Sequence, residues 1–143
     1  MKTLVTYFTL IVFLFSGCSS WQDRKIEKTV NQFWNAVEDK NIDGCIDLFH
    51  EGKSYSSGIH MQVDFLNKNY DKFNSYAHFK ENIIVKDTTY IGIKSKYVQY
   101  KIPAKFGTSN KDLTITFLFY KPLGGNKIIN TFFLSRNFAD WRK

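Results

Sequence analysis

The stretch YVQYKIPAKFGTSNKDLTITFLFYK, residues 97–121, decides the fold class of this chain. Every second residue in each half is apolar: Val98, Tyr100, Ile102, Ala104 and Phe106, then Leu113, Ile115, Phe117 and Phe119. Side chains along a strand point alternately to the two faces of a sheet, so this spacing predicts two half-buried strands joined by a turn at residues 107–110. Pro103 has no amide N–H to donate to a ladder, which predicts a sheet edge or a bulge at that position.

Further strands are expected on both sides of this hairpin. A turn at residues 122–126 contains a proline and two glycines, and residues 128–134 beyond it are rich in Ile and Phe. On the N-terminal side, residues 76–86 contain the run Ile-Ile-Val and are predicted to form the first strand. Residues 87–96 are then a connection that is extended in part. The expected sheet is antiparallel, with about four strands.

Three amphipathic helices are predicted before the strands. Their apolar residues recur at spacings of three and four: Ile26, Val30, Phe33, Trp34 and Val37; Ile42, Cys45, Ile46 and Phe49; Ile59, Val63, Leu66, Tyr70 and Phe73. The first helix follows a short tether at residues 18–22, and Asn41 or Asp43 is placed to cap the second. Cys45 is expected to be a small core residue. Helices followed by strands predict one α+β domain over residues 23–143, with the helices packed on a curved antiparallel sheet.

Two stretches of the chain resemble a known superfamily. VNQFWNAVEDKNIDGCIDLFHE, residues 30–51, looks like the opening of the nuclear-transport-factor-like superfamily, with an aromatic-bearing helix, a polar corner and a second helix. The alternating stretch is similar to that superfamily's long, bent strands. The resemblance implies a cone of helices over a curved sheet, and the cystatin-like arrangement is the alternative. Members include isomerases, dehydratases and non-catalytic binders, so the fold chooses no function, and no residue here matches a family site motif.

Residues 1–17 have the order of a secretory signal peptide. Lys2 gives a basic start, an uncharged run from Leu4 to Phe15 follows, and three small residues end at Cys18. The run is shorter than the roughly 20 residues that a helix needs to cross a bilayer. Phe-Ser-Gly-Cys at residues 15–18 resembles the lipobox of bacterial lipoproteins, although Leu is more usual than Phe15. The resemblance implies diacylglycerol on the Cys18 thiol, cleavage before Cys18, and acylation of its amine by a chain such as palmitate.

This leader also predicts where the protein is located. Lipid on Cys18 would anchor an exported domain, because two or more acyl chains hold a protein stably on a membrane. Ser19 replaces the aspartate that retains many lipoproteins of diderm bacteria at the inner membrane. The expected location is therefore the outer membrane facing the periplasm, and the alternative is the outer leaflet of the cytoplasmic membrane.

The net charge and the cysteine content limit the kinds of binding partner and disulfide that are expected for this protein. The formal net charge is +7 and the pI is about 9.4, but basic residues are interleaved with acidic and amide ones. An exported protein rarely meets nucleic acid, so solvated charge with modest attraction to anionic headgroups near the anchor is expected. With Cys18 lipidated, Cys45 would have no partner for an intramolecular disulfide.

The sequence contains no recognisable catalytic or metal-binding spacing. His-x-x-x-His, Cys-x-x-Cys and Gly-x-Ser-x-Gly patterns do not occur, so no metal, cofactor or catalytic residue is predicted. Aromatic residues make up 17% of the chain, and most are expected to fill the core. The alternative is an aromatic-lined pocket for an apolar small ligand, built from Tyr97, Phe117 and Phe119 with His78 at its wall.

Three functions fit these patterns. The favoured one is a membrane-anchored, non-catalytic binding or interaction module, because no catalytic spacing occurs. The alternative is a small pocket enzyme of isomerase or dehydratase type, with a carboxylate or histidine base and a tyrosine donor. A second alternative is an envelope-assembly or immunity-type partner of another envelope protein, which would present an exposed apolar patch.

Overall fold

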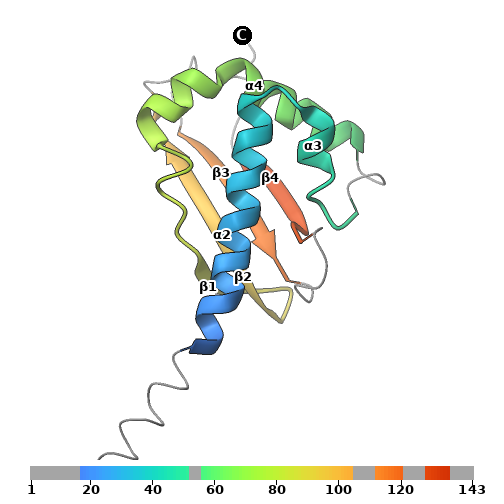
Figure 1. Ribbon diagram of the computed structural model, residues 1–143, viewed down its shortest axis with the longest axis vertical. Helices are drawn as coiled ribbons and strands as arrows, with labels where there is room; N and C mark the ends of the chain where they lie inside the picture. The colour runs from blue at the N-terminus through green and yellow to red at the C-terminus, as the bar shows by residue number, and fades with distance from the viewer. Residues whose placement is uncertain (1–16, 52–55, 105–111, 121–127, 136–143) are drawn as a thin grey trace, which may run out of the picture.

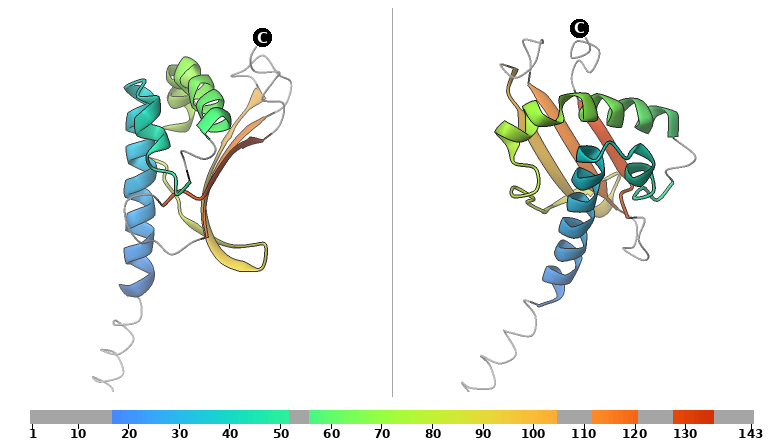
Figure 2. Two further views of the ribbon diagram at one scale, coloured as in Figure 1. Left: turned by 90° about the vertical axis from the view of Figure 1, so that its right-hand side faces the viewer. Right: turned by 45° about the horizontal axis from the view of Figure 1, so that its top comes forward.

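The alternating stretch at residues 97–119 forms the two central strands of the sheet. The computed structural model describes residues 17–51, 56–104, 112–120 and 128–135, in which three helices are followed by four strands (Figure 1). In chain order the elements are α2 (Gly17–Glu38), α3 (Ile42–Ile46), α4 (Ser56–Ala77), β1 (Lys86–Tyr90), β2 (Ile93–Ile102), β3 (Leu113–Phe119) and β4 (Thr131–Ser135). The predicted α+β class is confirmed, since the helices pack on one face of a curved, open sheet (Figure 2).

The sheet has the strand order β1-β2-β3-β4, and every neighbouring pair is antiparallel. Val98 lies opposite Phe117 and Tyr100 lies opposite Ile115, so these four side chains share one face. All four are buried in the core against the helices. A slip of one residue would turn this whole set toward the other face, so the period-two pattern fixes the register as well as the strands.

The strand predicted at residues 76–86 is wrong. Helix α4 continues to Ala77, and residues 78–85 are turn and coil. Strand β1 lies at residues 86–90, so all of it except Lys86 falls in the segment predicted as a partly extended connection. His78 ends the helix in a left-handed conformation with φ 45°. Ile83 and Val85 pack against the core while Ile84 is 62% exposed. The alternation therefore reflects a coil lying over the core, without a ladder of hydrogen bonds.

Pro103 marks neither an edge nor a bulge. It follows Ile102 directly at the end of β2, which is an interior strand, and so it terminates the ladder. Ala104 lies beyond the strand, while Phe106 and both turns predicted at 107–110 and 122–126 fall outside the described residues. The last strand begins at Thr131, later than predicted, because Ile129 instead pairs in parallel with Phe49.

The three predicted helices are present, and the first is longer than its apolar stripe. Helix α2 begins at Gly17, so residues 18–22, predicted as a tether, are helical. The spacing of apolar residues indicates only those turns of a helix that are buried, whereas a helix that has already formed can extend into solvent at little cost in free energy. Asn41 caps α3 as predicted, with its side-chain Oδ1 accepting a hydrogen bond of 2.9 Å from the amide of Gly44.

The β1–β2 turn holds an isoleucine in a strained conformation. Ile91 and Gly92 have φ values of 48° and 75° between the paired residues Tyr90 and Ile93. Positive φ at both central residues is typical of a type I′ turn, which strongly prefers Asn, Asp or Gly. For an L-residue with a Cβ the left-handed region costs roughly 1–2 kcal/mol. Ile91 is also 81% exposed, so packing within the domain does little to offset this cost.

Aromatic side chains fill the space between the helices and the sheet. The indole of Trp34 stacks on Phe79 with ring centroids 3.9 Å apart, and it meets Tyr100 and Phe117 edge to face at 5.5 and 5.7 Å. The Tyr100 hydroxyl donates a hydrogen bond of 2.9 Å to the carbonyl of Phe79. The chain segment after α4 is therefore fastened to β2 by a polar bond inside an apolar cluster.

Candidate functional site

The structure does not bring the predicted aromatic pocket together. Phe117 and Phe119 are buried on the core face of β3. Tyr97 lies opposite Leu118 in the register, so its side chain is on the other face of the sheet. The three residues therefore cannot line one cavity, and the two phenylalanines are part of the aromatic core.

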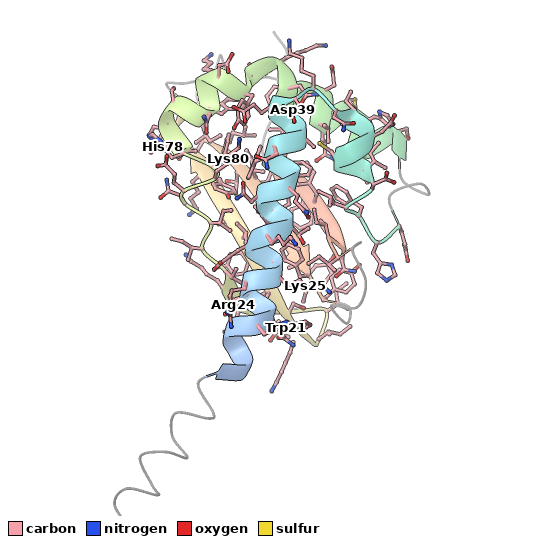
Figure 3. All side chains as sticks on the ribbon, in the orientation of Figure 1. Trp21, Arg24, Lys25, Asp39, His78 and Lys80 are labelled. Atoms are coloured by element: carbon pink, nitrogen blue, oxygen red, sulfur yellow. The ribbon has the colours of Figure 1, made fainter. Side chains whose placement is uncertain are left out.

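His78 lies away from these residues, at the end of α4 (Figure 3). Its imidazole is exposed, and Nδ1 is 3.5 Å from a carboxylate oxygen of Glu81. The carbonyl of His78 accepts hydrogen bonds from the amides of Glu81 and Asn82, and the Asn82 side chain donates to Ala77. This arrangement terminates the helix.

Two tyrosines are buried near this helix end. Burial is the main cause that raises the pKa of Tyr70, and burial also raises the pKa of Tyr100. The Tyr100 hydroxyl already donates its hydrogen bond to the carbonyl of Phe79 inside the core. Lys80 lies close to Tyr70 and forms an ion pair with Glu38 of α2, and this contact raises the pKa of Lys80.

A pocket of about 350 Å³ opens between the start of α4 and the ends of β3 and β4. It is lined by residues from four separate segments: Phe49, Glu51, Gly58, Ile59, Gln62, Tyr120, Asn130, Thr131 and Phe132. Phenylalanine and isoleucine side chains provide apolar lining, and the carboxylate, amide and hydroxyl groups provide polar lining. This composition resembles that of ligand sites, which combine apolar walls with a few polar groups that fix orientation.

Hydrogen bonds from main-chain amides to side-chain oxygens hold the pocket walls in place. The amide of Tyr120 donates to Asn130 Oδ1 at 2.8 Å, which joins the end of β3 to the segment before β4. The amide of Leu134 donates to Gln62 Oε1 at 3.2 Å, which joins β4 to α4. Each of these two amide side chains therefore uses its oxygen as an acceptor within the fold.

A second hollow of about 440 Å³ lies along α3 and α4, lined by Lys40, Ile42, Asp64, Asn67, Lys68 and Asp71. Lys68 Nζ is 2.7 Å from Asp64 Oδ2, so part of its charge is already neutralised within one helix face. Ile42 is its single apolar lining residue. We consider it the weaker candidate, because it offers an apolar ligand little surface to bury.

Sequence reasoning missed the pocket between α4 and β4. Its residues come from positions 49–51, 58–62, 120 and 130–132, and they share no spacing that a motif would reveal. The two cysteines are separate features: the side chain of Cys18, in the first turn of α2, lies outside the described part, and Cys45 is buried in the core as predicted.

Neither a metal site nor a membrane span is found in the part of the chain that the structure describes. No cluster of three or more His, Cys, Asp or Glu side chains is placed there to hold a metal ion. Among the same residues, no helix combines the length and apolarity that crossing a bilayer requires. No family model matches the chain, and no curated protein or solved structure is significantly similar to it.

Proposed function

We propose that this protein is an exported lipoprotein, anchored through lipid on Cys18, whose α+β domain is a non-catalytic binding module. The observation that carries the binding role is the pocket of about 350 Å³ between α4 and β4, with its apolar and polar lining. The ligand class that fits is a small organic molecule with one apolar face and hydrogen-bonding groups at its edge. The outer membrane facing the periplasm is the proposed location, as the leader indicates.

The packed interior supports a binding module over a pocket enzyme. The nuclear-transport-factor-like resemblance places catalysis in the cone between helices and sheet, but here Trp34, Phe79 and Phe117 occupy that space. An isomerase or dehydratase would need a base and a tyrosine donor converging on a cavity. Here the Tyr100 hydroxyl donates to the carbonyl of Phe79 inside the core, and His78 lies exposed at a helix end beside Glu81.

The anchor is tested by the intact mass of the full chain purified from membranes. We expect a polypeptide that begins at Cys18 and carries a diacylglyceryl group, with or without an acyl chain on its amine. A Cys18→Ser variant provides the control, because without the thiol the lipid has no attachment point. A chain with unmodified Cys18, or one that begins elsewhere, would refute the proposal.

The pocket is tested by filling it from Gly58. Gly58 lines the pocket and a Cβ added there meets no atom within 4 Å, so Gly58→Leu should fold normally and add a bulky side chain at the pocket wall. With a fluorinated benzamide as probe and the chain in nanodiscs, we expect ¹⁹F line broadening with the wild type and at least about tenfold weaker binding with Gly58→Leu, a difference of about 1.4 kcal/mol.

Gly58→Ala is the matched control for this experiment. It makes the same gain in helix propensity, at most about 1 kcal/mol, but adds only a methyl group. We expect it to bind the probe like the wild type. Equal binding by all three proteins, after subtraction of empty nanodiscs, would assign the probe to another place and remove the support for this pocket.

A further inference from the structure

The end of the molecule where α2 begins carries exposed apolar side chains from two elements. Figures 1 and 2 show the first turns of α2 and the β1–β2 turn at the same lower end of the domain. Trp21 of α2 is 59% exposed, and Ile91 and Ile93 of the hairpin are 81% and 50% exposed. Large apolar side chains gathered on one end of a protein indicate an interaction surface.

Basic side chains accompany these apolar ones. Arg24 and Lys25 lie about one turn after Trp21 on α2. Lys25 Nζ lies 5.6 Å from the centre of the Trp21 ring, and Arg24 lies on the other side of the helix (Figure 3). In the hairpin, exposed Lys94 follows Ile93, and at this end of β2 the two side chains point to opposite faces of the strand. We call these six residues the basal surface: Trp21, Arg24, Lys25, Ile91, Ile93 and Lys94. Tryptophan beside cations is the composition that proteins place at the boundary between water and lipid.

An ion-pair network joins the start of α2 to the β1–β2 hairpin. Lys96 Nζ lies 2.9 Å from Asp23 Oδ1 of α2 and 2.8 Å from Asp87 Oδ1 of β1. The Lys96 side chain is 17% exposed and Asp23 is 31% exposed, whereas Asp87 is 86% exposed, so water screens the Lys96–Asp23 pair less than the Lys96–Asp87 pair. Ile93 lies three residues before Lys96, about 10 Å along the strand, and its side chain is on the opposite face. The stem of the hairpin is therefore joined to the first turns of α2.

The strained turn points to the same conclusion. Ile91 occupies a left-handed conformation that favours Asn or Gly, and its side chain is exposed. A residue that weakens its own turn without packing in the domain suggests a role outside the domain. An apolar tip that enters a lipid layer would provide that role, because burial there removes the isoleucine from water.

We propose that the basal surface docks on an anionic bilayer, with Trp21 and Ile91 at the headgroup boundary and Arg24, Lys25 and Lys94 against lipid phosphates. This inference rests on the proposed anchor at Cys18, which lies in the first turn of α2 at this same end. Lipid on Cys18 would hold the basal surface within reach of the bilayer at all times. Docking then fixes the orientation of the domain on the membrane.

The test uses the full chain, purified from membranes and reconstituted in vesicles of phosphatidylethanolamine and phosphatidylglycerol with brominated or ordinary acyl chains. Bromine quenches tryptophan emission at short range, and subtracting the spectrum of a Trp21→Phe variant isolates Trp21 from Trp34 and Trp141. We expect brominated lipid to lower the Trp21 emission to about half or less, as for an interfacial tryptophan. Replacing phosphatidylglycerol with phosphatidylcholine, or raising the salt concentration, should weaken the quenching.

The variant Ile91→Asn with Ile93→Thr removes the apolar tip without harming the fold, because Asn suits the turn and Thr suits a strand. We expect it to lose about half or more of the quenching, while Ile84→Asn, at another exposed isoleucine, leaves the quenching unchanged.

Flotation of the protein with the vesicles tests the lipid anchor independently of docking. A chain that floats without Trp21 quenching would overturn docking and keep the anchor. Cross-linked dimers without quenching would assign the surface to a second copy instead.

Discussion

Replacing Trp34 with alanine is expected to lower the free energy of unfolding by about 3–5 kcal/mol, the largest effect of any single substitution proposed for this protein. Trp34 is fully buried and stacks on Phe79, which belongs to the segment after α4. It also meets Tyr100 of β2 and Phe117 of β3 edge to face. Its removal would leave a cavity at the point where a helix, a coil segment and two strands meet.

Urea unfolding followed by circular dichroism measures this loss without relying on tryptophan emission. Trp34→Phe should cost less, because a smaller ring still fills part of the site. Trp21→Ala is the matched control, since Trp21 is 59% exposed and should change stability by at most about 0.5 kcal/mol. A loss below about 1 kcal/mol for Trp34→Ala would contradict the central place given to this residue in the core.

The helices and the two central strands could be predicted because the spacing of their apolar residues follows which side chains are buried. Val98 and Tyr100 alternate with polar neighbours, and in the sheet they face the core opposite Phe117 and Ile115. Ile83-Ile84-Val85 shows where this logic fails. Two of these side chains pack on the core and Ile84 is exposed, as in a strand, but the segment is coil. Burial alone does not specify backbone pairing.

The candidate site was less predictable, for two separate reasons. Tyr97 and Phe117 do not share a face, because the alternation through Val98 and Tyr100 already places Tyr97 on the opposite face, as the register confirms. The strand pattern alone therefore argues against a pocket that contains both residues. The pocket between α4 and β4 could not have been found, because Gln62 and Asn130 reach it only through contacts between segments distant in sequence. The basal surface likewise depends on the hairpin turn and the start of α2 reaching the same lower end of the fold.

Native protein should label at Cys45 about a thousand times more slowly than unfolded protein when treated with a maleimide at pH 8. Burial raises the pKa of the Cys45 thiol to about 12. The fraction present as thiolate, the reactive form, is then about 10⁻⁴ at pH 8, against roughly a quarter for an unperturbed cysteine. Its Sγ lies 3.8 Å from the carbonyl of Phe33 in the core, which also blocks access. Fast labelling under native conditions would contradict this buried position.

The same pKa shift makes the free energy of unfolding depend on pH, so that the folded state loses stability as the pH rises above the pKa of the unfolded thiol. Between the unfolded pKa of about 8.5 and the folded value, the unfolded chain has lost the thiol proton while the folded chain keeps it. The contribution of Cys45 to the free energy of unfolding should therefore fall as pH rises through this window, by at most about 1.4 kcal/mol per pH unit. Cys45→Ala should remove this contribution. Urea unfolding of the wild type and of Cys45→Ala at a series of pH values therefore measures it, because the titration of Lys80 and Lys96 is the same in both proteins and cancels in the difference.

Counting thiols in the unfolded chain joins this prediction to the anchor. The sequence has two cysteines, so protein from membranes should show a single labelled thiol after unfolding if lipid occupies Cys18. Two labelled thiols would mean that Cys18 is unmodified, and they would refute the anchor while leaving the slow native labelling of Cys45 intact. Because Cys45 is shielded by the core and Cys18 would be blocked by a thioether, the native protein should expose almost no reactive thiol, for two unrelated physical reasons.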